Sequence, residues 1–173
     1  NWKGHFFIIT SLINTPGFLS ESDIYSLFKR GHIIGSHSHT HTCPFRSLSH
    51  KSQFEEWKIS KNILEDILNE KISTASVPGG DMDKATIISA HSAGIKHLFT
   101  SEPGLDIKTY KNMLIYGRFC PKNSTSSEVV NRWAQGKGIK RIKVMRYLKD
   151  MIKRSFICNK YIKFPNKGPV IEK

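Results

Sequence analysis

Short apolar runs and longer stretches with apolar residues every three or four positions alternate along this 173-residue chain. The short runs predict buried β-strands, and the longer stretches predict helices with one buried face. We expect strands at residues 6–10, 32–35, 73–77, 95–100 and 115–119. We expect helices at residues 21–30 and 52–68, between Asp83 and Gly94, and between Thr125 and Gly136. This alternation predicts an α/β fold with a mainly parallel sheet.

Polar residues and glycines mark the ends of two of these helices. Ser20, with Asp23 three residues later, predicts an N-terminal capping box, and Gly31 is expected to end the same helix. Thr125 with Glu128 has the same spacing and predicts a second capping box. These signals fix where the helices begin more closely than the apolar spacing does.

Three unusual segments follow predicted strands. They are the histidine-rich residues 36–41, the Pro-Gly-Gly turn at 78–80, and residues 100–104. In parallel sheets and barrels, binding and catalytic groups gather at the carboxyl ends of the strands. We therefore expect the three segments to contribute to one site.

The histidine-rich segment contains a candidate metal-ligand pair. His37 and His41 are four positions apart, so one helical turn would place them on the same face, about 6 Å apart. Imidazole nitrogens suit a tetrahedral zinc ion. Residues 38–40 lack the glutamate that follows the first histidine in zincins, which excludes that class. We expect neither His39 nor Cys43 to be a ligand. The alternative is that these histidines only pack and bond to the backbone.

Residues Ile34–His41 resemble the second motif, His-Ser/Thr-x-x-His, of the polysaccharide deacetylases (carbohydrate esterase family 4, the NodB homology domain). Residues 76–80 resemble the Arg-x-Pro-x-Gly motif of that family, and residues 93–101 resemble the strand that follows it. Residues 6–10 resemble the second strand of the family. The resemblance extends over roughly residues 6–133, and the histidine motif is its most specific part.

The resemblance implies a distorted (β/α) barrel, here without its N-terminal strand, that binds one divalent metal, usually zinc, through an Asp-His-His triad. His37 and His41 match the two histidine ligands. The metal would polarise an acetyl carbonyl and activate water for attack, which releases acetate from an N-acetylated or O-acetylated sugar or polysaccharide. We expect Pro78, Gly79 and Gly80 to form the floor of the substrate site, although an ordinary loop explains them nearly as well.

The chain departs from the family pattern in several places. Nothing matches the Thr-Phe-Asp-Asp first motif, which supplies the base and the third ligand, and Asp81 and Asp83 are not expected to replace it. Ser76 stands where the family arginine braces the catalytic base. Arg118 is our candidate to supply that charge, and a surface role for it is equally compatible with the sequence. Residues 114–116 lie near the position of the Leu-x-His motif but contain no histidine.

Charge is concentrated at the C-terminal end. The net charge is +13; residues 1–131 have 14 lysines and arginines against 12 acidic residues, and residues 132–173 have 13 against 2. We expect residues 1–136 to form a deacetylase-like domain and residues 137–173 a basic amphipathic segment, helical at 139–157. Such a helix suits an anionic membrane surface. It also suits packing of its apolar stripe (Ile142, Met145, Leu148 and Ile152) on the domain, whereas nucleic acid is a less favoured partner.

Two tryptophans, Trp57 and Trp133, lie on the apolar stripes of predicted helices, and we expect both in the core rather than at a sugar site.

The chain begins without an initiator Met or a signal peptide, almost inside a predicted strand, so we expect a fragment whose exposed strand edge favours aggregation.

Metal-dependent deacetylation is thus the leading hypothesis. A catalytically decayed carbohydrate-binding relative is the second, and a basic membrane-surface or nucleic-acid-binding protein is the third. The resemblance also implies the cell envelope, or the cytoplasmic face of a bacterial membrane, as the location.

Overall fold

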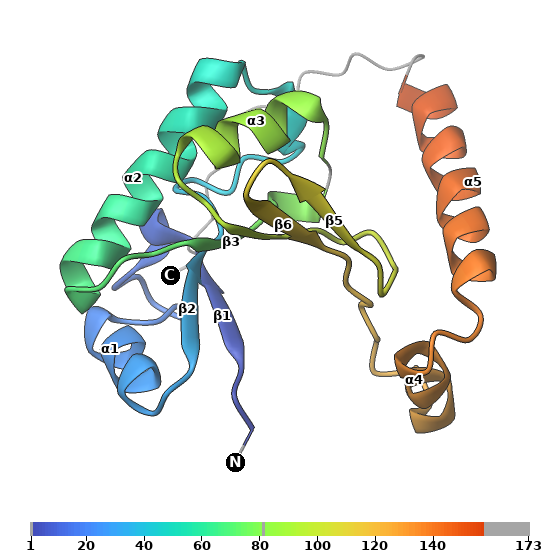
Figure 1. The fold of residues 1–173 in the computed structure, drawn as a ribbon, viewed down its shortest axis with the longest axis horizontal. Helices are drawn as coiled ribbons and strands as arrows, with labels where there is room; N and C mark the ends of the chain where they lie inside the picture. Colours follow the sequence, from blue (N-terminus) through green and yellow to red (C-terminus); the bar gives the residue numbers. More distant parts are fainter. Residues whose placement is uncertain (1, 81, 158–173) are drawn as a thin grey trace, which may run out of the picture.

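The computed structural model describes residues 2–80 and 82–157, and its strands form one six-stranded sheet (Figure 1). The strands are β1 (His5–Ile8), β2 (Ile33–Ser36), β3 (Thr74–Ser76), β4 (His97–Phe99), β5 (Ile107–Tyr110) and β6 (Met113–Tyr116). Their order is β1-β2-β3-β4-β6-β5, and every neighbouring pair is parallel except β5 with β6. The predicted α/β fold with a mainly parallel sheet is confirmed.

Five α-helices accompany the strands in the described residues. They are α1 (Glu21–Lys29), α2 (His50–Leu68), α3 (Lys84–Ser92), α4 (Ser127–Ala134) and α5 (Ile139–Ile157). Helices α1 to α3 lie together beside the sheet, whereas α4 and α5 stand apart from it on the other side of the molecule (Figure 1). None of the helices in the described part of the chain is long and apolar enough to span a bilayer.

Two apolar clusters join the sheet to helices α1 to α3. The larger cluster lies between α2, α3 and the central strands and contains Phe45, Trp57, Ala75, Val77, Ala90, Ile95, Leu98, Met113 and Ile115. The smaller cluster lies between α1, the C-terminal half of α2 and the β1–β2 edge and contains Ile8, Ile24, Ile34, Leu64, Leu68 and Ile72. Because α2 contributes to both clusters, it holds the two halves of the sheet in one body.

The first predicted capping box is confirmed. The Asp23 amide donates to Ser20 Oγ over 3.1 Å, and the Ser20 amide donates to the Asp23 carboxylate over 2.9 Å. The second is wrong, because α4 begins after Ser126 without a side-chain cap, and Thr125 Oγ1 instead accepts a hydrogen bond from the amide of Lys122. The Thr125 hydroxyl is therefore used in a local turn and does not cap the helix as the sequence spacing predicts.

Strand β5 was not predicted, and the strand expected at residues 115–119 lies at Met113–Tyr116. The two strands form an antiparallel hairpin in which Tyr110 pairs with Met113. Lys111, at the tip, has a φ of 51°. The turn is therefore Lys-Asn, which lacks the glycine that usually marks a two-residue hairpin in a sequence.

The two tryptophans differ in environment. Trp57 is fully buried, packs its ring 4.8 Å from that of Phe45, and donates from Nε1 to Ser89 Oγ over 3.2 Å. The prediction that Trp57 lies in the core is confirmed. Trp133 is only partly buried and stacks on Phe119 at 5.5 Å, on a helix with no buried residue. The corresponding prediction for Trp133 is wrong, because α4 does not pack against the sheet.

We expect Trp57→Ala to lower the free energy of unfolding by about 3–5 kcal/mol, since it leaves a cavity in the larger cluster and removes the indole N–H that donates to Ser89 Oγ. Ile59→Ala is the matched control on the same helix, because Ile59 is 40% exposed; it should cost less than about 1 kcal/mol. Urea unfolding of both variants measures the difference. Equal losses of unfolding free energy in the two variants would show that the buried face of α2 does not stabilise the core as described.

Candidate functional site

The three segments expected to share a site do follow the carboxyl ends of neighbouring strands. Residues 37–44 follow β2, the 3₁₀ turn Pro78–Gly80 follows β3, and residues 100–104 follow β4. The register that pairs Ser36 of β2 with Ala75 of β3 aligns the first two segments, and the Val77 amide, which donates to the carbonyl of Phe99 over 3.0 Å, ties the end of β3 to the end of β4. Strand pairing therefore brings the histidines and the Pro-Gly-Gly turn to one edge of the sheet.

The imidazole rings of His37 and His41 are neighbours, with centroids 4.8 Å apart. They meet in a loop and not on a helical turn, which corrects the geometry expected from their spacing. Ser38 and His41 both have positive φ, 64° and 57°. Two unusual backbone conformations thus fold the loop so that the side chains converge.

The buried hydroxyl of Ser38 holds this loop closed. Ser38 Oγ accepts a hydrogen bond from the His41 amide over 3.0 Å. The Ser38 amide in turn donates to Ser36 Oγ over 3.1 Å, and Ser36 Oγ donates to Ser60 Oγ on α2 over 2.7 Å. Ser36, Ser38 and Ser60 are all buried, so this short chain of hydroxyls replaces water for the backbone of the loop.

His37 is held in a single tautomer. Its Nδ1 lies 2.9 Å from the carbonyl oxygen of Ser76. Because a carbonyl only accepts, Nδ1 must carry the proton, and Nε2 of the neutral ring keeps its lone pair. Burial lowers the pKa of His37; the bond to Ser76 opposes that shift, and the neighbouring His41 and Arg118 add to it. A neutral ring with a free Nε2 is the form that binds a metal ion.

Glu56 on α2 positions the loop from the other side. Its carboxylate accepts hydrogen bonds from the His39 amide (2.9 Å), the Thr40 amide (2.8 Å) and Thr40 Oγ1 (2.7 Å). The sequence analysis missed this residue, because its partners lie sixteen and seventeen positions away and belong to no recognisable spacing. Glu56 fixes the backbone between the two candidate ligands.

The ring of His39 forms its hydrogen bond away from the His37–His41 pair. Its Nδ1 lies 3.0 Å from Thr10 Oγ1, in the 3₁₀ turn Thr10–Leu12 that follows β1. The amide of Ser11 also donates to the His39 carbonyl over 3.0 Å. His39 therefore ties the loop to the end of β1.

Arg118 lies two residues beyond β6, near the same edge of the sheet. Its Nε donates to the carbonyl of Thr100 over 2.8 Å, and its guanidinium carbon lies 5.8 Å from the centre of the Phe7 ring. The residue is partly buried, and its charge contributes to the lowered pKa of His37. Arg118 is therefore oriented by the protein and placed in the electrostatic field of the histidine pair.

The turn Pro78–Gly80 packs closely against two other segments of the site. Gly79 and Gly80 have φ values of 62° and 68°, a region that L-residues rarely adopt. A Cβ at Gly79 would lie 2.7 Å from Cys43 Sγ, and one at Gly80 would overlap Ser101. Glycine at both positions lets the backbone pass between the histidine loop and the segment after β4.

The remaining candidate ligands lie elsewhere or outside the description. Asp83 caps α3, accepting from the Thr86 amide over 2.8 Å, and Asp81 lies outside the described residues. Cys43 is exposed. Within residues 2–80 and 82–157, no three or more histidine, cysteine and acidic side chains are grouped so that they could hold a metal ion. His37 and His41 thus form a two-imidazole pair.

Comparison with known proteins identifies a family model that matches the part of the chain containing the histidine loop. The family model described as "Polysaccharide deacetylase" matches residues 1–98, which is more than half of the chain. No curated protein matches the chain.

Among solved structures, the chain is similar to the Streptococcus pyogenes deacetylase PplD in complex with acetate, with 22% identity and a TM-score of 0.65 over 75% of this chain and 57% of that one. It is similar to a polysaccharide deacetylase from Bacillus cereus, with 21% identity and a TM-score of 0.68 over 77% and 42%. A third is a de-N-acetylase from Aggregatibacter actinomycetemcomitans, with 14% identity and a TM-score of 0.67 over 77% and 65%.

The chain thus spans between 42% and 65% of the length of these three proteins, and at these identities the likeness shows the fold. The family-model match covers β1 to β3 and with them the histidine loop. Taken with the His-Ser-x-x-His sequence at residues 37–41, it shows that the chain belongs to the polysaccharide deacetylase family.

Proposed function

We propose that this chain belongs to a metal-dependent hydrolase that removes acetyl groups from an N-acetylated or O-acetylated sugar or polysaccharide. The observation that carries the proposal is the orientation of His37, whose Nδ1–H is bound by the Ser76 carbonyl while its ring lies 4.8 Å from that of His41. This arrangement leaves one ligand nitrogen free beside a second imidazole, and family membership supplies the class of reaction.

His37 and His41 fit a divalent ion, for which zinc is our choice because neutral imidazoles are among its preferred ligands. When bound, such an ion would supply polarisation of the acetyl carbonyl and a water of lowered pKa. The Ser76 carbonyl would act as the outer partner that keeps His37 in the correct tautomer. By the family resemblance, the third ligand would be an aspartate of the first motif. None of the described residues matches that motif.

Arg118 is proposed to brace a carboxylate at this edge of the sheet. Ser76 occupies the position of the family arginine, and its buried Oγ has no hydrogen-bond partner among the described residues. The Arg118 guanidinium uses Nε for the Thr100 carbonyl, which leaves its terminal nitrogens for an anionic group. A carboxylate base held there would face the histidine pair.

Pro78, Gly79 and Gly80 are proposed to form the floor against which the acetylated sugar lies. Pro78 is buried, and the two glycines present backbone where a side chain would collide with Cys43 or Ser101. The turn therefore packs between the histidine loop and the segment after β4, the two segments expected to line the site with it.

A carbohydrate-binding relative without catalysis is the second candidate. It is favoured by the two-imidazole pair, since the described residues provide no third ligand, and by the absence of arginine at position 76. Both candidates share the fold and the histidine loop, so acetate release is the property that distinguishes them.

Zinc binding tests the site directly. We expect His37→Ala and His41→Ala each to weaken zinc affinity at least about 100-fold, which exceeds the loss typical of an outer partner. His39→Ala is the matched control from the same loop, because that ring bonds to Thr10 and the Ser11 amide still holds the His39 carbonyl in the variant; its affinity should remain within about threefold of the parent. Isothermal titration of the metal-free proteins measures this. Equal affinity in all four proteins would overturn the proposed ligand pair.

Acetate release separates the two candidates. The full-length product of the gene, loaded with zinc, should release acetate from acetylated glucosamine oligomers, and His37→Ala should abolish release while His39→Ala retains it. Folded, zinc-loaded protein that binds the oligomers without releasing acetate, from N-acetylated or O-acetylated sugars, would favour the binding-only relative.

Glu56 provides a test of loop positioning. We expect Glu56→Ala to weaken zinc binding about 10- to 100-fold, because the loop between the ligands loses three hydrogen bonds. Glu56→Gln should have a zinc affinity between those of the parent and Glu56→Ala, since its amide oxygen can still accept hydrogen bonds from the loop. Asp66→Ala, which removes an exposed carboxylate from the same helix, should leave affinity unchanged. Parent-like affinity in Glu56→Ala would show that the loop holds its shape without this residue.

A further inference from the structure

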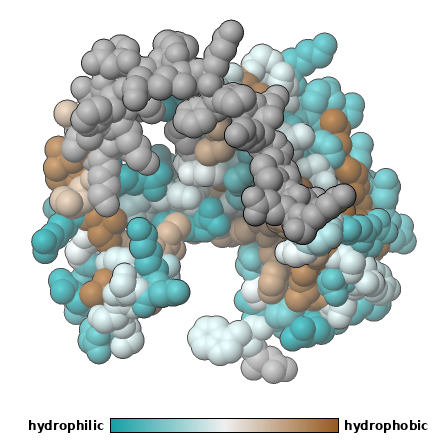
Figure 2. All heavy atoms as spheres, turned by 180° about the vertical axis from the view of Figure 1, so that it is seen from behind, coloured by the Kyte–Doolittle hydropathy of each residue, from teal (hydrophilic) through white to brown (hydrophobic). Residues whose placement is uncertain are grey.

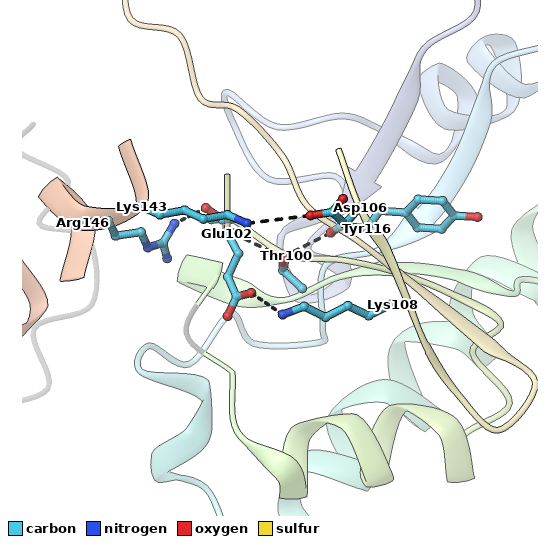
Figure 3. A network of polar contacts seen from close by, with 8 residues as sticks. Thr100, Glu102, Asp106, Lys108, Tyr116, Lys143 and Arg146 are labelled. Atoms are coloured by element: carbon cyan, nitrogen blue, oxygen red, sulfur yellow. Dashed lines mark hydrogen bonds and ion pairs between the residues drawn. The ribbon is translucent and has the colours of Figure 1, made fainter. Parts of the chain in front are cut away.

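Helix α5 approaches the rest of the molecule with its basic side chains. Lys143 Nζ lies 3.9 Å from Asp106 Oδ2, and the Arg146 guanidinium donates to the carbonyl of Ser101 (Figure 3). Both partners lie in residues 101–106, between β4 and β5. The same segment is anchored to the body by the ion pair of Glu102 with Lys108 at 3.0 Å. The helix is therefore docked by polar contacts.

Four apolar side chains in the described part of α5 are, by contrast, about half exposed to solvent. The exposed fractions are 56% for Val144, 50% for Met145, 45% for Leu148 and 48% for Met151. At 100° per residue, these four positions fall within an arc of about 120° on one side of the helix. Figure 2 shows apolar residues on the outer side of the part of the molecule that α4 and α5 form.

This arrangement decides between two alternatives that the sequence left open. Packing of the stripe on the deacetylase-like domain is contradicted for Met145 and Leu148, and Ile142 is only partly buried; the side chain of Ile152 lies outside the described residues. A contiguous apolar face presented to water marks an interaction surface.

The charge around this apolar face indicates what kind of partner would bind to it. Residues 139–157 contain seven lysines and arginines and one acidic residue. Lys140 lies at the border of the apolar arc and Arg141 at its N-terminal end, where long side chains can bury their methylenes and keep their charges at a polar boundary. An anionic lipid surface offers both an apolar phase and negative headgroups.

Two other occupants are disfavoured by the same observations. Nucleic acid would need the basic side chains, whereas two of these, Lys143 and Arg146, face Asp106 and Ser101. A second copy of the chain would bring two strongly basic helices together, which their charges oppose.

We propose that α5 is an interfacial helix that docks this protein on anionic lipid, with Val144, Met145, Leu148 and Met151 inserted at the boundary between headgroups and acyl chains. The segment that α5 contacts also meets the Pro78–Gly80 turn, since Ser101 lies against Gly80. Docking by α5 would therefore hold the candidate site close to the lipid surface. The proposal does not depend on zinc binding or deacetylation.

Co-sedimentation of the 173-residue chain with vesicles tests the proposal. We expect binding to vesicles of phosphatidylcholine with phosphatidylglycerol to be at least about tenfold stronger than to phosphatidylcholine alone, and to weaken as salt is raised. Leu148→Glu should lower binding to the anionic vesicles about tenfold or more, because it places a charge where docking would bury an apolar side chain. Tyr25→Glu is the matched control, since Tyr25 on α1 is also 45% exposed; it should bind as the parent does.

Circular dichroism and thermal melting of both variants would verify that the body remains folded, because neither side chain belongs to an apolar cluster. Parent-like binding by folded Leu148→Glu would overturn the proposal, as would absence of binding to either vesicle. Two further results would also overturn it: self-association without vesicles that Leu148→Glu abolishes, and binding of duplex DNA in place of the vesicles.

Discussion

The hydrogen bond from His37 Nδ1 to the carbonyl of Ser76 is the interaction on which the candidate site depends. It joins the residue after β2 to the last residue of β3, two strands whose register pairs Ser36 with Ala75. Parallel pairing places these positions at one edge of the sheet, and the bond then turns a strand end into an oriented ligand. Without the bond, the ring of His37 would be free to adopt the other tautomer and to rotate away from His41.

The loop that carries both histidines is stabilised by polar contacts more than by apolar packing. Ser38 closes it from within, and Glu56 holds it from α2. Because α2 also joins the two apolar clusters, the stability of the core and the geometry of the ligand pair rest on the same helix. This coupling explains how a loop with two residues at positive φ keeps a defined shape.

Much of the fold could be predicted from the sequence, because apolar periodicity and the Ser20–Asp23 box are local signals. The histidine pair could be found for the same reason, although its loop geometry could not. The role of Glu56 could not be predicted from the sequence, since it arises only when α2 packs beside the loop. The outward orientation of the apolar face of α5 was equally inaccessible, because it is set by the partners of Lys143 and Arg146 on a distant segment.

The tautomer of His37 in the metal-free protein is the most direct test of this account. Long-range ¹H–¹⁵N correlation spectra of the labelled chain, with His37→Ala used for assignment, distinguish a protonated Nδ1 from a protonated Nε2. The account predicts a neutral ring protonated at Nδ1, whose Nε2 resonance shifts when zinc is added. A ring protonated at Nε2, or an Nε2 resonance that zinc leaves unchanged, would contradict it.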